Sequence, residues 1–372
     1  MNIKKSIFSF GTLLLFSALL WSCSDSSDTN LEEDLSLVQI MEVKANALTD
    51  AVINISESKG FEIITVDDGA ELKHGSGVGD ISRYEMSITL DDIKGVYDYK
   101  KGLNHQQNST KYDYKRYFDK VDDSDLFILR LPKEKAMRPW KLHVDEDVEF
   151  VNDFVITTTD YNYAYSGGLN FDYLLNSEIE VDKENAGELF VNWSITDHMN
   201  FNYESKFTFT DDYSIGVLFD LDEKVSYQFN LMKGDDILFI EEVEISKSDD
   251  TNKKELEYSL IFGNIKIVWN SESHAYLVYR NDVLQEGAII EVSKHENVLD
   301  DANLAFCRKG RDIKITFDDG TSIELSELLS EDTLELMNEI FSSMYDMKFV
   351  KHIVDKVARE VYYTNLATEV VD

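Results

Sequence analysis

Residues 188–209 read ELFVNWSITDHMNFNYESKFTF and contain two runs in which alternate side chains are apolar. In one run the apolar positions are Leu189, Val191, Trp193 and Ile195, and in the other they are Phe201, Tyr203, Phe207 and Phe209. A period of two is typical of a strand that turns one face to a core and the other to water. The stretch therefore predicts two half-buried strands.

The same alternation continues in both directions, from about residue 150 to about residue 325. Further predicted strands contain Phe171, Tyr173 and Leu175, then Val225, Tyr227, Phe229 and Leu231, and others centre on Phe239, Tyr258, Ile267, Val278, Ile290, Phe306 and Ile315. Short turn-forming segments such as Lys233-Gly234-Asp235 separate them. Connections this short permit only antiparallel neighbours, so we expect one long antiparallel β-meander.

Helical periods precede and follow these strands. Between Leu35 and Lys59 a single stripe is formed by Val38, Met41, Ala45, Leu48, Val52 and Ile55, and Gly60 is the expected stop. Two strands, over Phe61–Val66 and Tyr84–Leu90, should follow, and two more helices should come after Leu325 with a break near Asp346. The predicted fold class is α+β, with the N-terminal helix and the C-terminal helices packed on one face of the meander.

The charge balance excludes one broad class of partner. The chain has 36 basic and 72 acidic residues, a net charge of -36 at pH 7. Such a surface repels nucleic acid and anionic lipid head groups, so we expect no nucleic-acid partner. With 43% hydrophobic residues the chain still has enough apolar side chains for a sizeable core.

The N-terminus has the features of an export signal. Lys4 and Lys5 precede an apolar run over residues 7–20, and the small residue Ser22 comes directly before Cys23. The spacing Leu20-Trp21-Ser22-Cys23 resembles a bacterial lipobox, in which the cysteine thiol is acylated and becomes the first residue of the mature chain. The resemblance implies that a lipid on Cys23 attaches the protein to a membrane; a soluble exported protein is the alternative.

Several segments together resemble the uncharacterised large outer-membrane lipoproteins of the Bacteroidetes. These segments are the lipobox with its acidic tether, Ile93-Lys94-Gly95-Val96-Tyr97-Asp98-Tyr99, the tyrosine-rich strands, Phe317-Asp318-Asp319-Gly320-Thr321 and the helical C-terminus. The resemblance implies an outer-membrane lipoprotein at the cell surface, with the periplasmic face as the alternative. It carries no catalytic residue with it.

Four segments are expected along the chain. They are a lipoprotein signal peptide over 1–22, an acidic tether over 23–34, an N-terminal α+β lobe over 35–135, and an antiparallel sheet with C-terminal helices over 136–372. About 350 mature residues exceed the size of a usual single core, which favours two lobes or one elongated sheet.

Direct signals for chemistry are weak. The seven histidines have no metal-ligand spacing, no nucleophile elbow is present, and acidic doublets such as Asp318-Asp319 fall where turns fall. Cys307, which lies in a predicted strand, is best explained as a small buried side chain. We expect no metal, no cofactor and no catalytic residue, although paired carboxylates on distant strands leave an enzyme possible.

Three hypotheses for function remain. The first is a surface-exposed, non-catalytic lipoprotein with a binding or structural role. The second is a half-barrel carrier of an apolar ligand or lipid, similar to the lipoprotein-localisation factors, with Phe201, Tyr203, Phe207 and Phe209 lining its cavity. The third is a glycan-binding lipoprotein in which Trp140, Trp193 or Trp269 stacks on sugar rings. For each of these aromatic residues taken by itself, core packing is the better explanation.

A basic, tyrosine-rich segment over residues 99–120 is the candidate surface for an unknown protein partner. Its candidate residues are Tyr112, Tyr114, Lys115 and Arg116, because tyrosine and arginine are favoured at binding surfaces. A solvated hairpin whose aromatic side chains pack inward is the alternative.

The lipobox generates the first testable prediction. Cys23→Ala removes the thiol that the lipid would occupy, so the protein should move from the membrane fraction to the soluble fraction. Fractionation of cells followed by immunoblotting measures this. Unchanged retention in membranes would contradict lipidation at Cys23.

Overall fold

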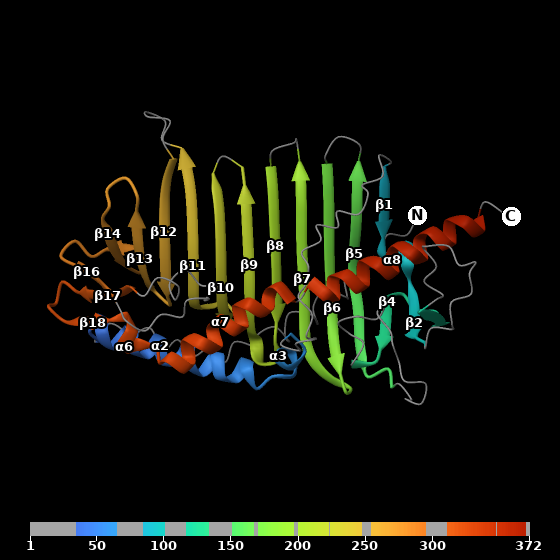
Figure 1. Ribbon diagram of the computed structural model, residues 1–372, viewed down its shortest axis with the longest axis horizontal. Coiled ribbons are helices and arrows are strands. Elements are labelled where there is room, and N and C mark those ends of the chain that lie inside the picture. The colour runs from blue at the N-terminus through green and yellow to red at the C-terminus, as the bar shows by residue number, and fades with distance from the viewer. Residues whose placement is uncertain are drawn as a thin grey trace, which may run out of the picture.

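A computed structural model of the chain describes residues 35–64, 85–100, 117–133, 151–166, 170–196, 200–222, 224–247, 254–294, 311–346 and 348–369. Its main element is a fifteen-stranded sheet with helices packed against one face (Figure 1). The predicted α+β class is confirmed. The signal peptide, Cys23 and the acidic tether lie outside the described residues.

The meander makes up most of this sheet, and consecutive strands in it are antiparallel neighbours. Its strands are β5 (Phe154–Ser166), β6 (Asn170–Val181), β7 (Glu184–Thr196), β8 (Asn200–Thr208), β9 (Tyr213–Leu221), β10 (Val225–Lys233), β11 (Asp236–Lys247), β12 (Lys254–Phe262), β13 (Ile265–Asn270), β14 (Tyr276–Arg280) and β15 (Val283–Leu284). A short 3₁₀ turn, Thr210–Asp212, joins β8 to β9. The predicted antiparallel meander is therefore confirmed.

The sheet continues beyond β5 into the N-terminal part of the chain. This end contains β1 (Met86–Thr89), helix α4 (Leu90–Ile93), β2 (Gly95–Tyr99), β3 (Phe118–Asp122) and β4 (Phe127–Leu131). β4 and β5 pair antiparallel on either side of the lobe boundary expected near residue 135, whereas β2 and β4 pair in parallel. The sheet itself thus runs across that boundary.

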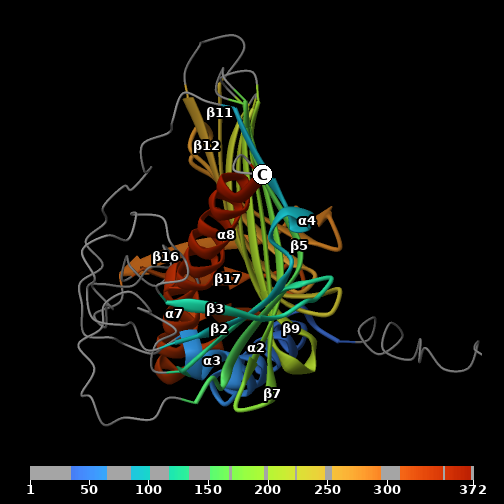
Figure 2. The same cartoon turned by 90° about the vertical axis from the view of Figure 1, so that its right-hand side faces the viewer.

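The remaining strands form a second, three-stranded sheet. They are β16 (Ile289–Lys294), β17 (Arg311–Thr316) and β18 (Ser322–Glu324), all antiparallel. Cys307 lies outside the described residues. The small sheet and helices α7 and α8 lie to the same side of the main sheet (Figure 2).

Four helices bury apolar residues on this side: α2 (Leu37–Ser56), α3 (Lys59–Ile64), α7 (Glu331–Asp346) and α8 (Lys348–Glu369). The short helix α6 (Leu325–Leu328) contacts the small sheet and α2. The break expected near Asp346 is present. None of the helices in the described part of the chain combines the length and apolar character that membrane-spanning helices need.

Helix α2 begins with a capping box. The Ser36 hydroxyl accepts a hydrogen bond from the Gln39 backbone N–H at 3.3 Å, and the Gln39 side chain accepts one from the Ser36 N–H at 2.9 Å. Of the predicted stripe, all members except Val38 are buried, and Val38 packs at its margin.

The strand predicted over Phe61–Val66 is wrong, because residues 59–64 form helix α3. The Ser58 hydroxyl accepts a hydrogen bond from the Phe61 N–H at 3.1 Å and caps this turn. Gly60 lies inside α3 and does not terminate α2. A Cβ at Gly60 would come within 2.5 Å of the Ala186 carbonyl oxygen, so glycine allows the helix to approach β7 closely.

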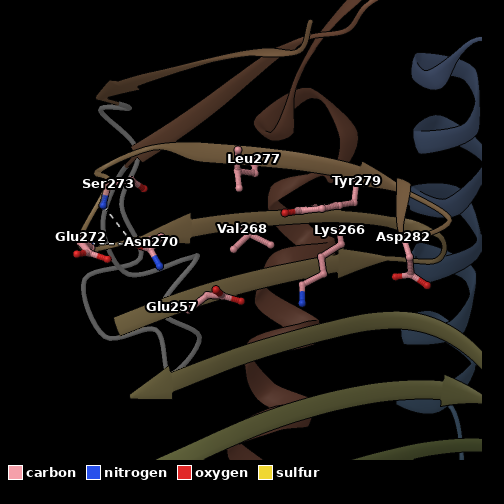
Figure 3. Close-up of a pocket in the computed structure, with 9 residues that line it drawn as sticks. All are labelled: Glu257, Lys266, Val268, Asn270, Glu272, Ser273, Leu277, Tyr279 and Asp282. Carbon is pink, nitrogen blue, oxygen red and sulfur yellow. Dashed lines mark hydrogen bonds between the residues drawn. The ribbon is translucent and has the colours of Figure 1, made fainter. Parts of the chain in front are cut away.

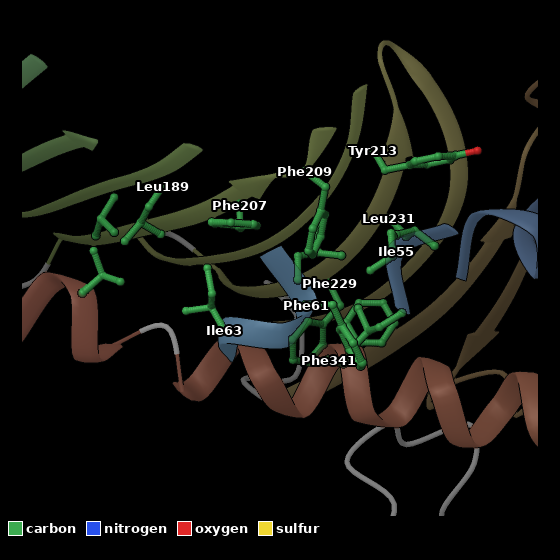
Figure 4. Close-up of a cluster of buried hydrophobic side chains, with 14 of the residues drawn as sticks. Ile55, Phe61, Ile63, Leu189, Phe207, Phe209, Tyr213, Phe229, Leu231 and Phe341 are labelled. Carbon is green, nitrogen blue, oxygen red and sulfur yellow. The ribbon is translucent and has the colours of Figure 1, made fainter. Parts of the chain in front are cut away.

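Phe207 and Phe209 lie in the core directly beneath α3 (Figure 4). They are 1% and 3% exposed, and their ring centroids are 4.8 Å apart in an edge-to-face arrangement. Nearby, Phe341 of α7 packs edge-on against Phe229 of β10, with centroids 5.2 Å apart. Helices therefore fill this part of the sheet face.

The packing around Phe207 generates the second prediction. Phe207→Ala should lower the free energy of unfolding by roughly 3 to 5 kcal/mol, because it leaves a cavity beneath α3. Denaturant unfolding measures the loss. Phe190→Ala is the matched control, since Phe190 is half-exposed on the opposite face of β7. Similar losses for both variants would contradict this description of the core.

Candidate functional site

An unbroken row of side chains crosses the helix-facing side of the sheet from β5 to β14. Each residue is the direct cross-strand partner of the next, and all except Val243 are aromatic. In order, the row is Tyr163, Tyr173, Trp193, Tyr203, Phe219, Tyr227, Val243, Tyr258, Trp269 and Tyr276. We call it the aromatic row.

A second row runs parallel to it, two residues closer to the strand ends at the top of Figure 1. It is apolar throughout and contains Tyr165, Phe171, Ile195, Phe201, Leu221, Val225, Ile245 and Leu256. We call the two rows together the apolar band. The band lies on one face because side chains two residues apart in a strand share a face.

Burial changes sharply between adjacent rows. The next row below the band is Tyr161, Leu175, Val191, Ser205, Val217, Phe229, Glu241, Leu260, Ile267 and Val278, and all except Val217 are buried. From Trp193 to Tyr276 every member of the aromatic row is only half-buried, and Leu221 in the second row is 37% exposed. Helices α7 and α8 cross in front of the sheet below the upper ends of β7 to β12 (Figure 1).

The rings of the band pack against one another edge to face. Ring centroids are 4.6 Å apart for Phe171 and Trp193 and 5.2 Å apart for Phe201 and Phe219, at interplanar angles of 67° and 78°. Trp193 and Tyr203 meet at 6.4 Å and 78°. This interlocked arrangement presents a continuous apolar surface made of ring edges and faces together.

The structure divides the predicted ligand-binding residues into two groups. Trp193, Phe201 and Tyr203 belong to the apolar band, whereas Phe207 and Phe209 share its face but lie in the filled core. Trp269, predicted to contact a glycan, also belongs to the aromatic row. Trp140 and the predicted partner-binding residues Tyr112, Tyr114, Lys115 and Arg116 lie outside the described residues.

One edge of helix α8 borders the band at β5 and β6. Asp355 is 8% exposed, and its Oδ1 accepts hydrogen bonds from the Tyr161 hydroxyl at 3.1 Å and the Tyr173 hydroxyl at 2.9 Å. Its Oδ2 accepts a third from Lys351 Nζ at 2.6 Å. The Lys351 ammonium also lies 4.1 Å from the centre of the Tyr173 ring. Asp355 thereby joins the helix to the sheet through charge-assisted hydrogen bonds.

Arg359 continues this edge one helical turn further on. Its guanidinium carbon lies 4.5 Å from the centre of the Tyr163 ring. The sequence prediction missed this charged face of α8, because it followed only the apolar residues of the helix. The face consists of Lys351, Asp355 and Arg359. The spacing i, i+4, i+8 of three charged residues is the signal that identifies it.

The opposite face of the sheet carries a polar row. Asp172, Ser194, Asn202 and Asp220 are successive cross-strand partners there. A shallow open hollow of about 430 Å³ lies on this face, lined by residues of β12 to β14 and their turns (Figure 3). The Asn270 side-chain oxygen in it accepts from the Glu272 and Ser273 N–H groups at 2.8 and 3.2 Å, so it is engaged in its own turn.

The described residues contain no group of three or more His, Cys, Asp or Glu side chains placed to hold a metal ion. No protein-family model matches the chain, and no curated protein or solved structure matches it either.

The hydrogen bonds from Tyr161 and Tyr173 to Asp355 of α8 generate the third prediction. Burial, followed by the charge of Asp355, raises the pKa of Tyr161 and of Tyr173 well above the ordinary value. In the unfolded chain both ionise near pH 10. Their contribution to stability is thus fully present below about pH 10 and is lost as the pH rises through the higher folded pKa.

The free energy of unfolding should therefore fall more steeply above about pH 10 in the wild type than in a Tyr161→Phe, Tyr173→Phe double variant. Denaturant titrations at a series of pH values and constant ionic strength measure both slopes. Equal slopes would show that the two hydroxyl groups are accessible to solvent.

Proposed function

We propose that this chain is a membrane-anchored, non-catalytic binding protein, and that its apolar band binds an apolar ligand. The lipid expected on Cys23 would hold the protein at a membrane. The observation that supports binding is the half-buried part of the aromatic row, which runs from Trp193 to Tyr276. Large contiguous apolar surfaces on folded proteins are typically sites of interaction.

The division of the sheet face favours binding over a purely structural role. Around Phe207 and Phe209 the helices fill the face, so this part stabilises the fold. The band lies further along the same strands and is not needed to bury α3 or α7. This face of the sheet thus combines a filled core with an open surface. The ligand of the carrier hypothesis would lie on the open part, the apolar band.

The ring geometry favours an apolar ligand over a glycan. Sugar recognition uses exposed ring faces flanked by polar groups that bind hydroxyls, whereas the rings here interlock at steep angles. Ser194, Asn202 and Asp220 lie on the opposite face of the sheet, and Ser205 and Glu241, which share the face of the band, are buried in the next row. Tyrosine hydroxyls and Trp193 Nε1 are the main polar atoms that the band offers.

The length of the band suits an acyl chain. Seven strand-to-strand steps separate Trp193 from Tyr276, which at about 4.8 Å each gives roughly 34 Å. A single leaflet of a bilayer contributes about half of its roughly 30 Å hydrocarbon thickness. An extended acyl chain of ordinary length therefore fits along the aromatic row.

Binding of a neutral fluorescent apolar dye provides the fourth prediction. The mature chain with Cys23→Ser, which carries no lipid of its own, should bind the dye saturably. Phe201→Ala with Phe219→Ala removes two rings in contact and should weaken binding by about tenfold or more, as expected for lost apolar contact.

Phe190→Ala, which removes a phenylalanine from the opposite face of β7, should leave the affinity unchanged. In a Trp140→Phe background, a brominated fatty acid should quench the fluorescence of the two band tryptophans, Trp193 and Trp269. Absence of saturable binding, or equal loss in the Phe190 control, would overturn the proposed function.

A further inference from the structure

The tether that precedes helix α2 is long enough to bring Cys23 to the apolar band. The described residues begin at Leu35, and the tether over residues 23–34 comes directly before it. At about 3.4 Å per residue an extended tether bridges roughly 40 Å. An acyl chain on Cys23 adds about 15 Å, the hydrocarbon thickness of one bilayer leaflet.

Helix α2 starts close to the β12–β14 end of the band. Lys44 of α2 lies at the turn between β12 and β13, because a Cβ added to Gly263 would come within 2.7 Å of Lys44 Cδ. The stretch from Leu35 to Lys44 is at most about 18 Å long, and the strand from Gly263 to Trp269 rises about 20 Å. Leu35 therefore lies no more than about 45 Å from Trp269, and α2 crosses the strands, which shortens the direct path (Figure 1). The tether and the lipid together exceed this distance.

The chemistry of an acyl chain also matches that of the band. A chain with a net charge of -36 repels anionic ligands, whereas an acyl chain carries no charge. The half-buried part of the aromatic row, from Trp193 to Tyr276, offers it apolar contact along its length. Helix α8 borders the band at the opposite end, at β5 and β6, so a lipid from the tether would enter at Tyr276 and extend toward Trp193.

We propose that the acyl chain on Cys23 is itself a ligand of the apolar band. This assignment rests on the proposed function and on lipidation at Cys23, and it adds a regulation of membrane attachment. The lipid has two alternative positions, the band of its own chain and the membrane. The tether holds it near the band at an effective concentration on the order of millimolar, so the band competes with the membrane. Another apolar ligand that fills the band releases the lipid to the membrane.

The lipid of a second copy is a poorer occupant of the band. Each copy carries a net charge of -36, so two copies repel one another unless salt screens them. A lipid on the same chain needs no such approach, because its tether already ends beside the β12–β13 turn. The length of the tether and the charge of the chain therefore favour binding within one molecule.

The test attaches one uncharged chain to the mature protein, residues 23–372, in a Cys307→Ala background that leaves Cys23 as the single thiol. N-hexadecyl iodoacetamide alkylates this thiol, and iodide leaves as the carbon–sulfur bond forms. The affinity for the neutral fluorescent dye should fall by about tenfold or more, relative to the same protein alkylated with N-ethyl iodoacetamide. The short adduct occupies the same thiol but is too small to fill the band.

Attachment on the other face of the sheet is the matched control. Glu188 is exposed, whereas its neighbour Leu189 is buried on the helix side of β7. In a Cys23→Ser, Cys307→Ala, Glu188→Cys variant the same hexadecyl chain should leave the dye affinity unchanged.

A loss of rings from the band tests the competition with the membrane. The hexadecyl protein with Phe201→Ala and Phe219→Ala should bind neutral phosphatidylcholine vesicles about tenfold more tightly than the hexadecyl protein without these changes. The reason is that the altered band no longer holds the chain. Equal binding to vesicles would contradict a competition between the band and the membrane.

A measurement in cells uses the natural chain and needs no change at Cys307. A fatty acid with a photoreactive diazirine is incorporated into the lipid on Cys23. Irradiation should then join the Cys23 peptide to peptides from β8 to β13 of the same chain, which mass spectrometry identifies. Cross-links from this lipid to phospholipid alone would overturn the proposal.

The outcomes distinguish this inference from the proposed function. If the dye binds the Cys23→Ser chain and hexadecylation of Cys23 leaves its affinity unchanged, the inference is overturned and the proposed function stands. If the dye does not bind the Cys23→Ser chain, the proposed function itself fails. A loss of dye affinity that grows with protein concentration, with a doubled mass in light scattering, would place the lipid in a second copy and overturn binding within one chain.

Discussion

The structure depends on the register of strand pairing from β5 to β14, which is regular throughout the apolar band. In an antiparallel sheet a slip of one residue would move every side chain to the opposite face, and the rows would be lost. Irregularities do occur, at Thr158/Asp160, Ile179/Glu180 and Leu231/Met232. All of them lie toward the ends of the strands that the helices cover, so the apolar band contains none. Register alone therefore aligns side chains from ten strands into rows of one chemical character.

Much of this could be predicted from the sequence, because most strands of the meander keep the alternation of apolar and polar side chains. Trp193, Phe201 and Tyr203 were identified as residues of one face on this basis. Phe207 and Phe209 share that face, yet no local pattern tells which part of a strand a helix will cover. That depends on Gly60 of α3 and on Phe341 of α7, which are distant in sequence. The strand predicted at Phe61 failed for a related reason: two apolar residues spaced by two fit a strand and a short helix equally, and close packing on β7 decides between them.

The two C-terminal helices are held to the sheet by different interactions. Helix α7 packs through apolar side chains such as Phe341, whose contacts with Phe229 and Phe239 are non-directional. Helix α8 adds a polar edge in which Asp355 receives three hydrogen bonds, so its rotation about its own axis is fixed as well as its position. This edge is what sets Arg359 over Tyr163. A hydrophobic stripe on its own would tolerate small rotations and would place the guanidinium less precisely.

The order of the strands in the meander has a consequence for how such a protein can evolve. Since each strand pairs with its neighbours in sequence, a duplicated hairpin would lengthen the rows by about 10 Å and leave every other pair intact. A deleted hairpin would shorten them by the same step, while the end bounded by α8 would stay unaltered. The length of the apolar band is thus set by the number of hairpins. Relatives that differ by one hairpin would be expected to bind ligands that differ in length by about 10 Å.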